Sequence, residues 1–267
     1  MSCFGNKVVV ITGAGSGIGR CLAQQCAAKG AQLAVSDVNA DGLKETLASL
    51  PNGTKARSYI VDTANVDQVF AHAEEVKRDF GGAHFLFNNA GVMLNGTFDH
   101  QTIQELEWQV NINMWGVIYG CKAFLPIMME QREGCLINIS SVIGLIGFPL
   151  QTGYAISKFA IRGLTECLWS ELEGTGVRAI VVHPGGTRTN IKANTRMAAR
   201  AGAEEERYAG VADTIMRTSP EDLVGEILAG VERGDKRIVP GYLAGRIFWL
   251  SRLLPNSYDR LVKRMTK

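Results

Sequence analysis

Seven short apolar runs recur along this chain of 267 residues, each separated from the next by a longer stretch. Most of the runs are apolar throughout and do not alternate with polar residues, which is typical of strands in a parallel sheet covered on both faces. Strands that alternate with crossover helices build a doubly wound parallel sheet. The expected strands are residues 7–12, 31–37, 57–62, 84–89, 135–140, 177–183 and 237–240.

The stretches between the runs carry helical signals. Residues 17–29 and 65–79 repeat apolar side chains at the spacing of one helix face. The sequence SPEDLVGEIL, residues 219–228, opens a late helix, with Ser219 as the expected N-cap, Pro220 at the first helical position and Asp222 completing a capping box. We therefore expect an α/β fold with about seven parallel strands and helices on both faces.

The composition is ordinary for a globular protein, with 46% hydrophobic and 20% charged residues. No Pro- or Ser-rich linker, low-complexity run or internal repeat divides the chain, and α/β folds of about 250 residues are often a single unit. We expect one domain over residues 1–267. The net charge of +2 argues against a nucleic-acid partner, which would normally require a concentration of Lys and Arg.

The six cysteines form no CxxC pair and lie mostly within apolar segments. They are interpreted as small core residues in a reducing compartment, not as disulfides or zinc ligands. The four histidines have no metal-ligand spacing, and His183 at the end of an apolar run indicates a structural role. The N-terminal MSCFGNK leads directly into the first run with no signal peptide, and we find no run of about 18 uncharged apolar residues. The expectation is a cytoplasmic protein without a metal.

The first run ends in the glycine-rich sequence TGAGSGIG, residues 12–19, which opens the first expected helix. Glycines let the backbone approach a pyrophosphate, and a helix N-terminus offers free N–H groups and the positive end of the dipole. The spacing is GxxxGxG, not the commoner GxGxxG. Its place in the first strand-to-helix turn favours nucleotide binding. The expected contacts are Gly13, Ser16, Gly17, Ile18 and Gly19.

The next three runs end in polar residues that extend this site. Asp37 can accept hydrogen bonds from a ribose diol and would repel a 2′-phosphate, and Val38 after it is not basic. This favours NAD over NADP; the alternative is that Asp37 only caps the following helix. Asp62 and Thr63 end the third run and are expected near the adenine. The fourth run ends in NNAG, whose Asn89, Ala90 and Gly91 would pack near the dinucleotide.

A tyrosine and a lysine lie one helical turn apart in GYAISKFAIRG, residues 153–163. Residues at i and i+4 share a helix face, so Tyr154 and Lys158 should project in the same direction. Taken alone, the pair also fits a half-buried tyrosine beside a solvated lysine.

Taken together, TGxxxGIG, NNAG and YxxxK with a serine thirteen residues upstream resemble the short-chain dehydrogenase/reductase family. The motifs follow the family's order and spacing over about residues 5–240. The resemblance implies a Rossmann-like fold, hydride transfer between NAD(H) and an alcohol or ketone, and a homo-oligomer, either a tetramer or a dimer. Ile156 and a second glycine at Gly186 depart from the family pattern without removing a functional group. The implied catalytic residues are Asn113, Ser141, Tyr154 and Lys158, and the further cofactor contacts are Tyr154, Lys158, Pro184, Gly185, Thr187 and Thr189.

Acid–base chemistry explains why such a pair would be useful. Oxidising an alcohol requires a base for its hydroxyl proton, and a free tyrosine with a pKa of about 10 is a poor base at neutral pH. The ammonium of Lys158 and a cationic nicotinamide ring would both favour the phenolate, so we expect a Tyr154 pKa near 7, a change of roughly 4 kcal/mol. Ser141 would bind the substrate oxygen, and Asn113 would anchor a water chain from Lys158.

Two of these assignments have neighbours that could replace them. Ser140 adjoins Ser141, and the thirteen-residue spacing to the tyrosine selects Ser141. Asn111 lies close to Asn113, and the NxxG match to Gly116 selects Asn113.

The substrate-side positions named by the resemblance are mostly apolar and predict an apolar secondary alcohol or ketone as the small-molecule partner. A long mixed-charge segment, 187–216, is a candidate lid over this cleft. The competing functions are an NADPH-dependent 3-oxoacyl reductase and a catalytically silent NAD-binding regulator. The substrate-side positions are Val92, Met93, Val142, Ile143, Phe148 and Leu150.

The C-terminal segment, 241–267, is amphipathic and basic. Leu243, Ile247, Leu250 and Leu254 recur at i, i+4, i+7 and i+11 and form one apolar stripe. The stripe could pack on a neighbouring subunit, cap the substrate cleft, or lie on a membrane surface as a peripheral contact.

Overall fold

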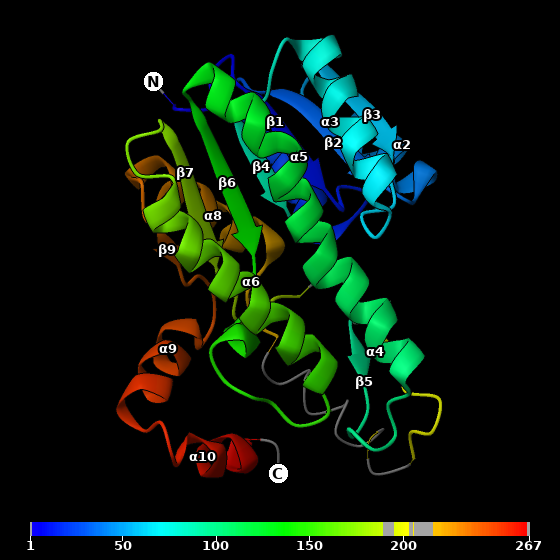
Figure 1. Cartoon of the computed structure of the whole chain (residues 1–267), viewed down its shortest axis with the longest axis vertical. Coiled ribbons are helices and arrows are strands. Elements are labelled where there is room, and N and C mark those ends of the chain that lie inside the picture. The colour runs from blue at the N-terminus through cyan, green and yellow to red at the C-terminus, as the bar shows by residue number, and fades with distance from the viewer. Residues whose placement is uncertain (1, 189–194, 203–204, 206–215, 266–267) are drawn as a thin grey trace.

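A seven-stranded, fully parallel sheet forms the centre of the computed structural model, which describes residues 2–188, 195–202, 205 and 216–265 (Figure 1). The strand order is β3-β2-β1-β4-β6-β7-β9. The strands β2 and β3 are added on one side of β1, and from β4 onward successive strands are added on the other side, so the strand order reverses between β1 and β4. The expected doubly wound fold of about seven strands is confirmed. The strands are β1 (Val8–Thr12), β2 (Gln32–Asp37), β3 (Ala56–Ile60), β4 (Phe85–Asn88), β6 (Gly134–Ile139), β7 (Val177–Val182) and β9 (Arg237–Ile238).

The largest differences from the expected strands lie at the edges of the sheet and outside it. The edge strand β3 ends at Ile60, before Asp62, and most of its side chains are not buried because one side of it has no neighbouring strand. Two two-residue strands, β5 (Leu94–Asn95) and β8 (Arg196–Met197), form a separate small sheet. Strands this short have no periodicity that a sequence could reveal.

Helices cover both faces of the large sheet. The helices α1 (Gly17–Ala28), α2 (Ala40–Ala48) and α8 (Pro220–Arg233) lie on one face, and α3 (Val66–Phe80), α5 (Gly116–Gln131) and α6 (Thr152–Glu171) lie on the other. The three expected helices are confirmed to within a few residues at their ends. Ser219 caps α8 as expected, since its Oγ accepts the Asp222 N–H at 3.0 Å.

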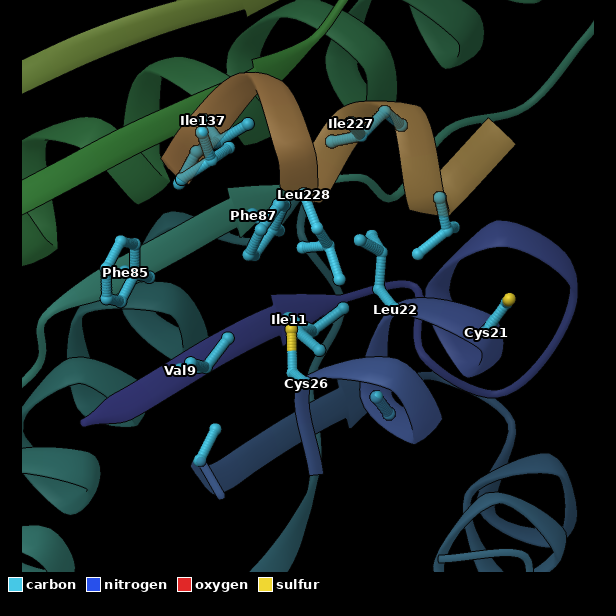
Figure 2. Packing of buried hydrophobic residues seen from close by; sticks show 14 of the residues in the cluster. Val9, Ile11, Cys21, Leu22, Cys26, Phe85, Phe87, Ile137, Ile227 and Leu228 are labelled. Atoms are coloured by element: carbon cyan, nitrogen blue, oxygen red, sulfur yellow. The ribbon is translucent and has the colours of Figure 1, made fainter. Parts of the chain in front are cut away.

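The alternation of side chains along the strands divides the core into two layers. In β1, Val9 and Ile11 point to the layer under α1 and α8, where they pack on Leu22 and Leu228 (Figure 2). Val8 and Val10 belong to the opposite layer, under α3 and α5. Four of the six cysteines are buried as expected, while Cys3 and Cys167 are exposed; all six are free thiols.

One continuous helical run, Ile103–Gln131, is long and apolar enough to cross a membrane by length and composition alone. It consists of α4 (Ile103–Val110), a single π-helical turn η1 (Asn111–Trp115) and α5. Half of its apolar window is buried inside the structure, where α5 packs on α3 and β6. The run is therefore a core helix of this fold.

The chain ends in two further helices, α9 (Ala244–Leu253) and α10 (Tyr258–Met265). They lie at the end of the molecule toward which the arrowhead of β6 points (Figure 1). This is the end of a parallel sheet at which doubly wound folds bind their ligands.

Candidate active site

A cavity of about 500 Å³ opens at the carboxyl ends of the strands, beside the point where the strand order reverses. It brings together almost all of the residues expected at a cofactor site, although they come from the ends of six strands and from the first turns of α6. Thr189 lies outside the described residues. The expected residues that line the cavity are Gly13, Ser16, Gly17, Ile18, Gly19, Asp37, Asp62, Thr63, Asn89, Ala90, Gly91, Ser141, Tyr154, Lys158, Pro184, Gly185 and Thr187.

The glycine loop between β1 and α1 has no room for a Cβ at two of its glycines, Gly13 and Gly19. Gly13 has a φ of +66°, and a Cβ on it would lie 2.7 Å from the Cα of Ala90. A Cβ on Gly19 would collide with the carbonyl oxygen of Gly13. Within the described residues, the N-cap Ser16 makes no side-chain hydrogen bond to the first turn of α1. The loop therefore presents a bare backbone and the N–H groups of a helix start, which is the geometry that binds a pyrophosphate.

The NNAG turn is hydrogen-bonded to the end of β1, where the glycine loop begins. The Asn89 side-chain nitrogen donates to the carbonyl oxygen of Thr12 at 2.9 Å, and the Thr12 hydroxyl accepts the N–H groups of Asn89 and Ala90 at 3.0 Å. The turn lines the cavity and also fixes the exit of β1, so its structural and binding roles coincide.

Asp37 lies at the edge of the cavity with both carboxylate oxygens on backbone N–H groups. One accepts from Gly15 at 2.8 Å and the other from Asn39 at 2.9 Å. The N-cap of α2 is Asn39, whose side chain accepts the Gly42 N–H. Asp37 is therefore not the cap of α2, and its carboxylate remains on the cavity wall.

Positive charge is scarce in the cavity. Among its lining residues that the structure describes, Lys158 is the only lysine or arginine. Arg20, next to the glycine loop, does not line it; its guanidinium donates to the Gly15 carbonyl oxygen at 2.5 Å and to the Glu45 carboxylate at 2.7 Å. The region around Asp37 thus offers no cation to a 2′-phosphate within the described chain.

Tyr154 and Lys158 project from the first turns of α6 into the cavity. Both are buried, with exposed fractions of 7% and 3%, so the interpretation as a half-buried tyrosine beside a solvated lysine is wrong. The Lys158 Nζ lies 5.4 Å from the centre of the Tyr154 ring and donates to the carbonyl oxygen of Ile139 at 2.9 Å.

Burial dominates the ionisation of this pair. It raises the pKa of Tyr154 to about 12, opposed by a hydrogen bond with Ser141, and it lowers the pKa of Lys158 to about 8. The expected value near 7 applies to a site that also holds the cationic nicotinamide ring, and it stays a prediction; in the chain by itself the pKa of Tyr154 is raised. Desolvation of the phenolate is the largest effect on Tyr154, and desolvation of the ammonium is the effect on Lys158.

The two adjacent serines have different roles. The Ser140 hydroxyl donates to the main-chain carbonyl oxygen of Lys158 at 2.8 Å and so ties β6 to α6. The Ser141 Oγ accepts the Ile143 N–H at 3.2 Å and hydrogen-bonds with Tyr154. The choice of Ser141 as the residue beside the tyrosine agrees with this geometry.

Asn113 is fully buried in the π-helical turn η1, whereas Asn111 is exposed. The side-chain oxygen of Asn113 accepts the Val92 N–H at 2.8 Å, and the side-chain nitrogen of Asn113 donates to the Val92 carbonyl oxygen at 2.9 Å. A Cβ on Gly91 would lie 3.3 Å from the Asn113 Oδ1 and 3.6 Å from the Lys158 Nζ. Asn113 therefore lies just behind the cavity wall, next to Lys158.

The outer part of the cavity is apolar. Five of the six substrate-side residues line it, but Leu150 does not: its carbonyl oxygen accepts the Gly96 N–H at 2.9 Å instead. Pattern reasoning missed several lining residues, because a loop or helix position gives no signal that it faces a cavity. The missed apolar residues are Ile112, Ile139, Ile146, Met216 and Val262.

The C-terminal helices close this apolar end. Ile247 and Leu250, two members of the expected stripe, line the cavity, while Leu254 is exposed. The Tyr258 hydroxyl accepts the Gly147 N–H at 3.2 Å, which joins α10 to the segment between Ser141 and Tyr154. Of the three alternatives for the stripe, this geometry fits the one in which it caps the cleft.

Most of the candidate lid, 187–216, lies outside the described residues. The part that is described contacts the segment around β5: Glu205 is buried, and its carboxylate accepts the Thr97 N–H at 3.0 Å. Backbone hydrogen bonds from Thr97 and Gly202 hold the pKa of Glu205 at about 2.

The family model of the short chain dehydrogenases matches residues 7–200, and the chain belongs to this family of oxidoreductases. The chain is 41% identical to a putative oxidoreductase, SadH, of Mycobacterium tuberculosis over 98% of this chain and 96% of that protein. It is 30% identical to estradiol 17-beta-dehydrogenase 11 of Pongo abelii, over 97% of this chain and 82% of that protein.

The solved structures agree. A short-chain dehydrogenase/reductase from Burkholderia phymatum in complex with NAD superposes with a TM-score of 0.87 at 28% identity, covering 98% of this chain and 97% of that one. Levodione reductase superposes with a TM-score of 0.81 at 29% identity, covering 91% of this chain and 98% of that one.

Proposed function

We propose that this protein transfers a hydride between NAD(H) and an apolar secondary alcohol or ketone, with Tyr154 as the acid and base. The observation that supports this best is the convergence of Ser141, Tyr154 and Lys158 in one buried cavity that is continuous with the bare glycine loop.

The residues of the loop fit the dinucleotide that this family uses. The uncapped start of α1 and the glycines at 13 and 19 would hold the pyrophosphate, and Asp37 would hold the adenosine ribose. Lys158, Thr187 and the Pro184-Gly185 turn line the opposite part of the cavity, where they would hold the nicotinamide ribose and amide. When bound, the dinucleotide supplies the hydride, or accepts it, and carries a cationic ring in its oxidised form.

The proton is handled by the chain's own residues. With a pKa of about 12, the Tyr154 hydroxyl is protonated at neutral pH, which is the form that donates to a ketone oxygen during reduction. Ser141, hydrogen-bonded with Tyr154, would hold the same oxygen. Oxidation needs the opposite proton transfer, so its rate should rise with pH through the neutral range while the rate of reduction should not.

The preference for NAD over NADP follows from charge. A 2′-phosphate would meet the Asp37 carboxylate and no cation among the described lining residues, because Arg20 is bound by Gly15 and Glu45. The complex of the Burkholderia phymatum relative with NAD supports the same choice. The NADPH-dependent 3-oxoacyl reductase is disfavoured on this ground.

The apolar substrate follows from the outer part of the cavity, where side chains from three segments meet. Val142 and Ile143 follow the serine, Met93 follows the NNAG turn, and Ile247 and Leu250 come from α9. We propose α9 and α10 as a cap on this side of the cavity and residues 187–216 as a lid. A silent NAD-binding regulator would not need Ser141, Tyr154 and Lys158 to converge.

The test is a screen of secondary alcohols and ketones, from small to bulky, with NAD(H) and NADP(H), followed by the absorbance of reduced nicotinamide. We expect turnover of apolar compounds with at least about a tenfold preference for NAD, or about 1.4 kcal/mol. Turnover that is equal or faster with NADP would overturn the cofactor assignment, and NAD binding without any turnover would favour the regulator.

A further inference from the structure

His183 is a fully buried histidine that the proposed chemistry does not use. It follows β7 directly, and its Nδ1 lies 3.0 Å from the main-chain carbonyl oxygen of Ser141. The residues on either side of it bond the residues on either side of the serine. The carbonyl oxygen of Val182 accepts the Ser140 N–H at 2.8 Å, and that of Pro184 accepts the Val142 N–H at 3.0 Å.

Three consecutive residues at the end of β7, beginning with its last residue Val182, thus hold three consecutive residues after β6. Only the middle contact uses a side chain, because the main-chain bonds join the residues on either side of it and the His183 N–H donates to the carbonyl oxygen of Ile238 instead. The Ser141 carbonyl oxygen also accepts the Gly144 N–H at 2.9 Å. The His183 ring therefore supplies the second donor of this carbonyl.

The network around the ring fixes which nitrogen carries the proton. The Arg237 guanidinium lies with its Nη1 3.2 Å from the His183 Nε2, and a guanidinium can only donate. The Nε2 must then be the acceptor, and the proton of the neutral ring must be on Nδ1, where it is donated to the Ser141 oxygen. Burial, together with the nearby Arg237 and Arg162, lowers the pKa of His183 to about 4, which keeps the ring neutral.

Arg237 is itself held from two sides. Its Nη2 donates to the Glu166 carboxylate at 2.6 Å, and Glu166 also accepts from the Nε of Arg162 at 2.7 Å. The guanidinium lies 5.3 Å from the centre of the Trp169 ring and 5.7 Å from that of Phe248, on α9. A donor that is ordered by an ion pair and two aromatic rings can select one tautomer of its acceptor.

We propose that His183 is a positioning residue for the reaction: its neutral, Nδ1-protonated ring sets the main chain of Ser141 so that the serine hydroxyl stays beside Tyr154. The inference rests on the proposed function of Ser141. Because a small misplacement of a catalytic group is costly, loss of the Nδ1–H donor should lower the turnover number and leave cofactor binding unchanged.

Three substitutions of His183 distinguish the effect of the Nδ1–H donor from that of the rest of the ring. The side-chain nitrogen of asparagine can occupy the place of Nδ1, because both atoms are bonded to Cγ; that of glutamine lies one bond farther out, and leucine has no polar atom. We expect His183→Leu and His183→Gln to lower kcat by about tenfold or more and to leave the KM for NAD within about twofold. His183→Asn should restore kcat to within about threefold of the wild type.

His72 provides a matched control. It is also buried, and burial lowers its pKa to about 4, but within the described structure neither of its ring nitrogens has a hydrogen-bond partner. His72→Leu and His72→Asn should therefore change stability and leave kcat unaltered. A loss of kcat in these variants equal to that in the His183 variants would overturn the proposal, since any buried histidine would then behave alike.

The tautomer can be measured without turnover, on the wild-type protein with and without NAD. A long-range ¹H–¹⁵N correlation spectrum should show His183 neutral and protonated at Nδ1, and an Nε2-protonated ring would overturn the proposal even if His183→Leu fails to fold. A kcat of His183→Gln close to that of the wild type would also overturn the proposal, and so would a kcat of His183→Asn as low as that of His183→Leu. Ser141→Ala distinguishes a failure of the proposed function from a failure of the role of His183. If Ser141→Ala stays active, the proposed function fails. If Ser141→Ala is inactive while the His183 variants stay active, only the role of His183 fails.

Discussion

The two halves of the cavity are built in different ways. The half that would hold the dinucleotide is made largely of main chain at the ends of β1 and β4, where glycines leave no room for a Cβ and Asn89 hydrogen-bonds the loop, with the Asp37 carboxylate at the end of β2. The half that would hold the substrate is made of side chains, from the segment after β6, from η1 and from α9 and α10. A backbone site is defined by a few residue types at fixed spacing, whereas a side-chain wall can be built from almost any apolar residues.

Among the variants that compare the two halves, the largest expected effect is in the half that would hold the dinucleotide. In Gly19→Ala, the added methyl group collides with the Gly13 carbonyl oxygen and approaches the Asn89 side chain. Overpacking of this kind costs about 1–3 kcal/mol, so the Kd of NAD should rise by about tenfold to a hundredfold, as measured by calorimetry.

Gly163→Ala is the matched control, because no described atom lies within 4 Å of a Cβ at that exposed helical position. It should leave the Kd of NAD unchanged and stabilise α6 by about 0.5–1 kcal/mol. If both variants bind NAD normally, the close packing of the loop has no part in binding.

The second prediction concerns charge in the same half. Replacing Asp37 by Ala and Val38 by Arg removes the carboxylate that opposes a 2′-phosphate and adds a cation to the cavity wall. The ratio of kcat/KM for NADP to that for NAD should rise by about tenfold or more. Asp62→Ala serves as the control. An equal rise of this ratio in Asp62→Ala would show that the loss of any carboxylate from the cavity changes the cofactor preference, and that Asp37 has no specific role.

The third prediction tests the side-chain half and is smaller. Tyr258→Phe removes the acceptor for the Gly147 N–H and keeps the aromatic ring. A neutral hydrogen bond contributes about 0.5–1.5 kcal/mol, so the KM for bulky apolar alcohols should rise by about twofold to tenfold. The KM for NAD should not change, and neither value should change in Tyr119→Phe, whose ring stacks on Trp115 away from the cavity. An equal rise in both constants for Tyr258→Phe would contradict the division into two halves.

The same division explains what the sequence could predict. The strands, the glycine loop, Asp37 and the Tyr154–Lys158 pair follow local rules of spacing, and the sheet topology brings them together. Val262 lines the cavity because α10 returns across the segment after Ser141, and no local pattern encodes that contact.

Two other differences have physical causes of their own. Asn113 lies in a π-helical turn and accepts the N–H of Val92, which is 21 residues away in the chain, and local spacing does not show that contact. The pKa of Tyr154 rises because burial desolvates the phenolate, an effect that one helical turn of sequence cannot show.

The central proposal is that Tyr154 transfers the proton where the two halves of the cavity meet. Tyr154→Phe keeps the ring and removes only the hydroxyl, so the most direct measurement is its turnover of a good secondary alcohol beside its Kd for NAD. We expect turnover to fall by about a hundredfold or more, since acid–base catalysis is typically worth 10² to 10⁴, while the Kd of NAD stays within about twofold. Near-native turnover with normal NAD binding would contradict the account.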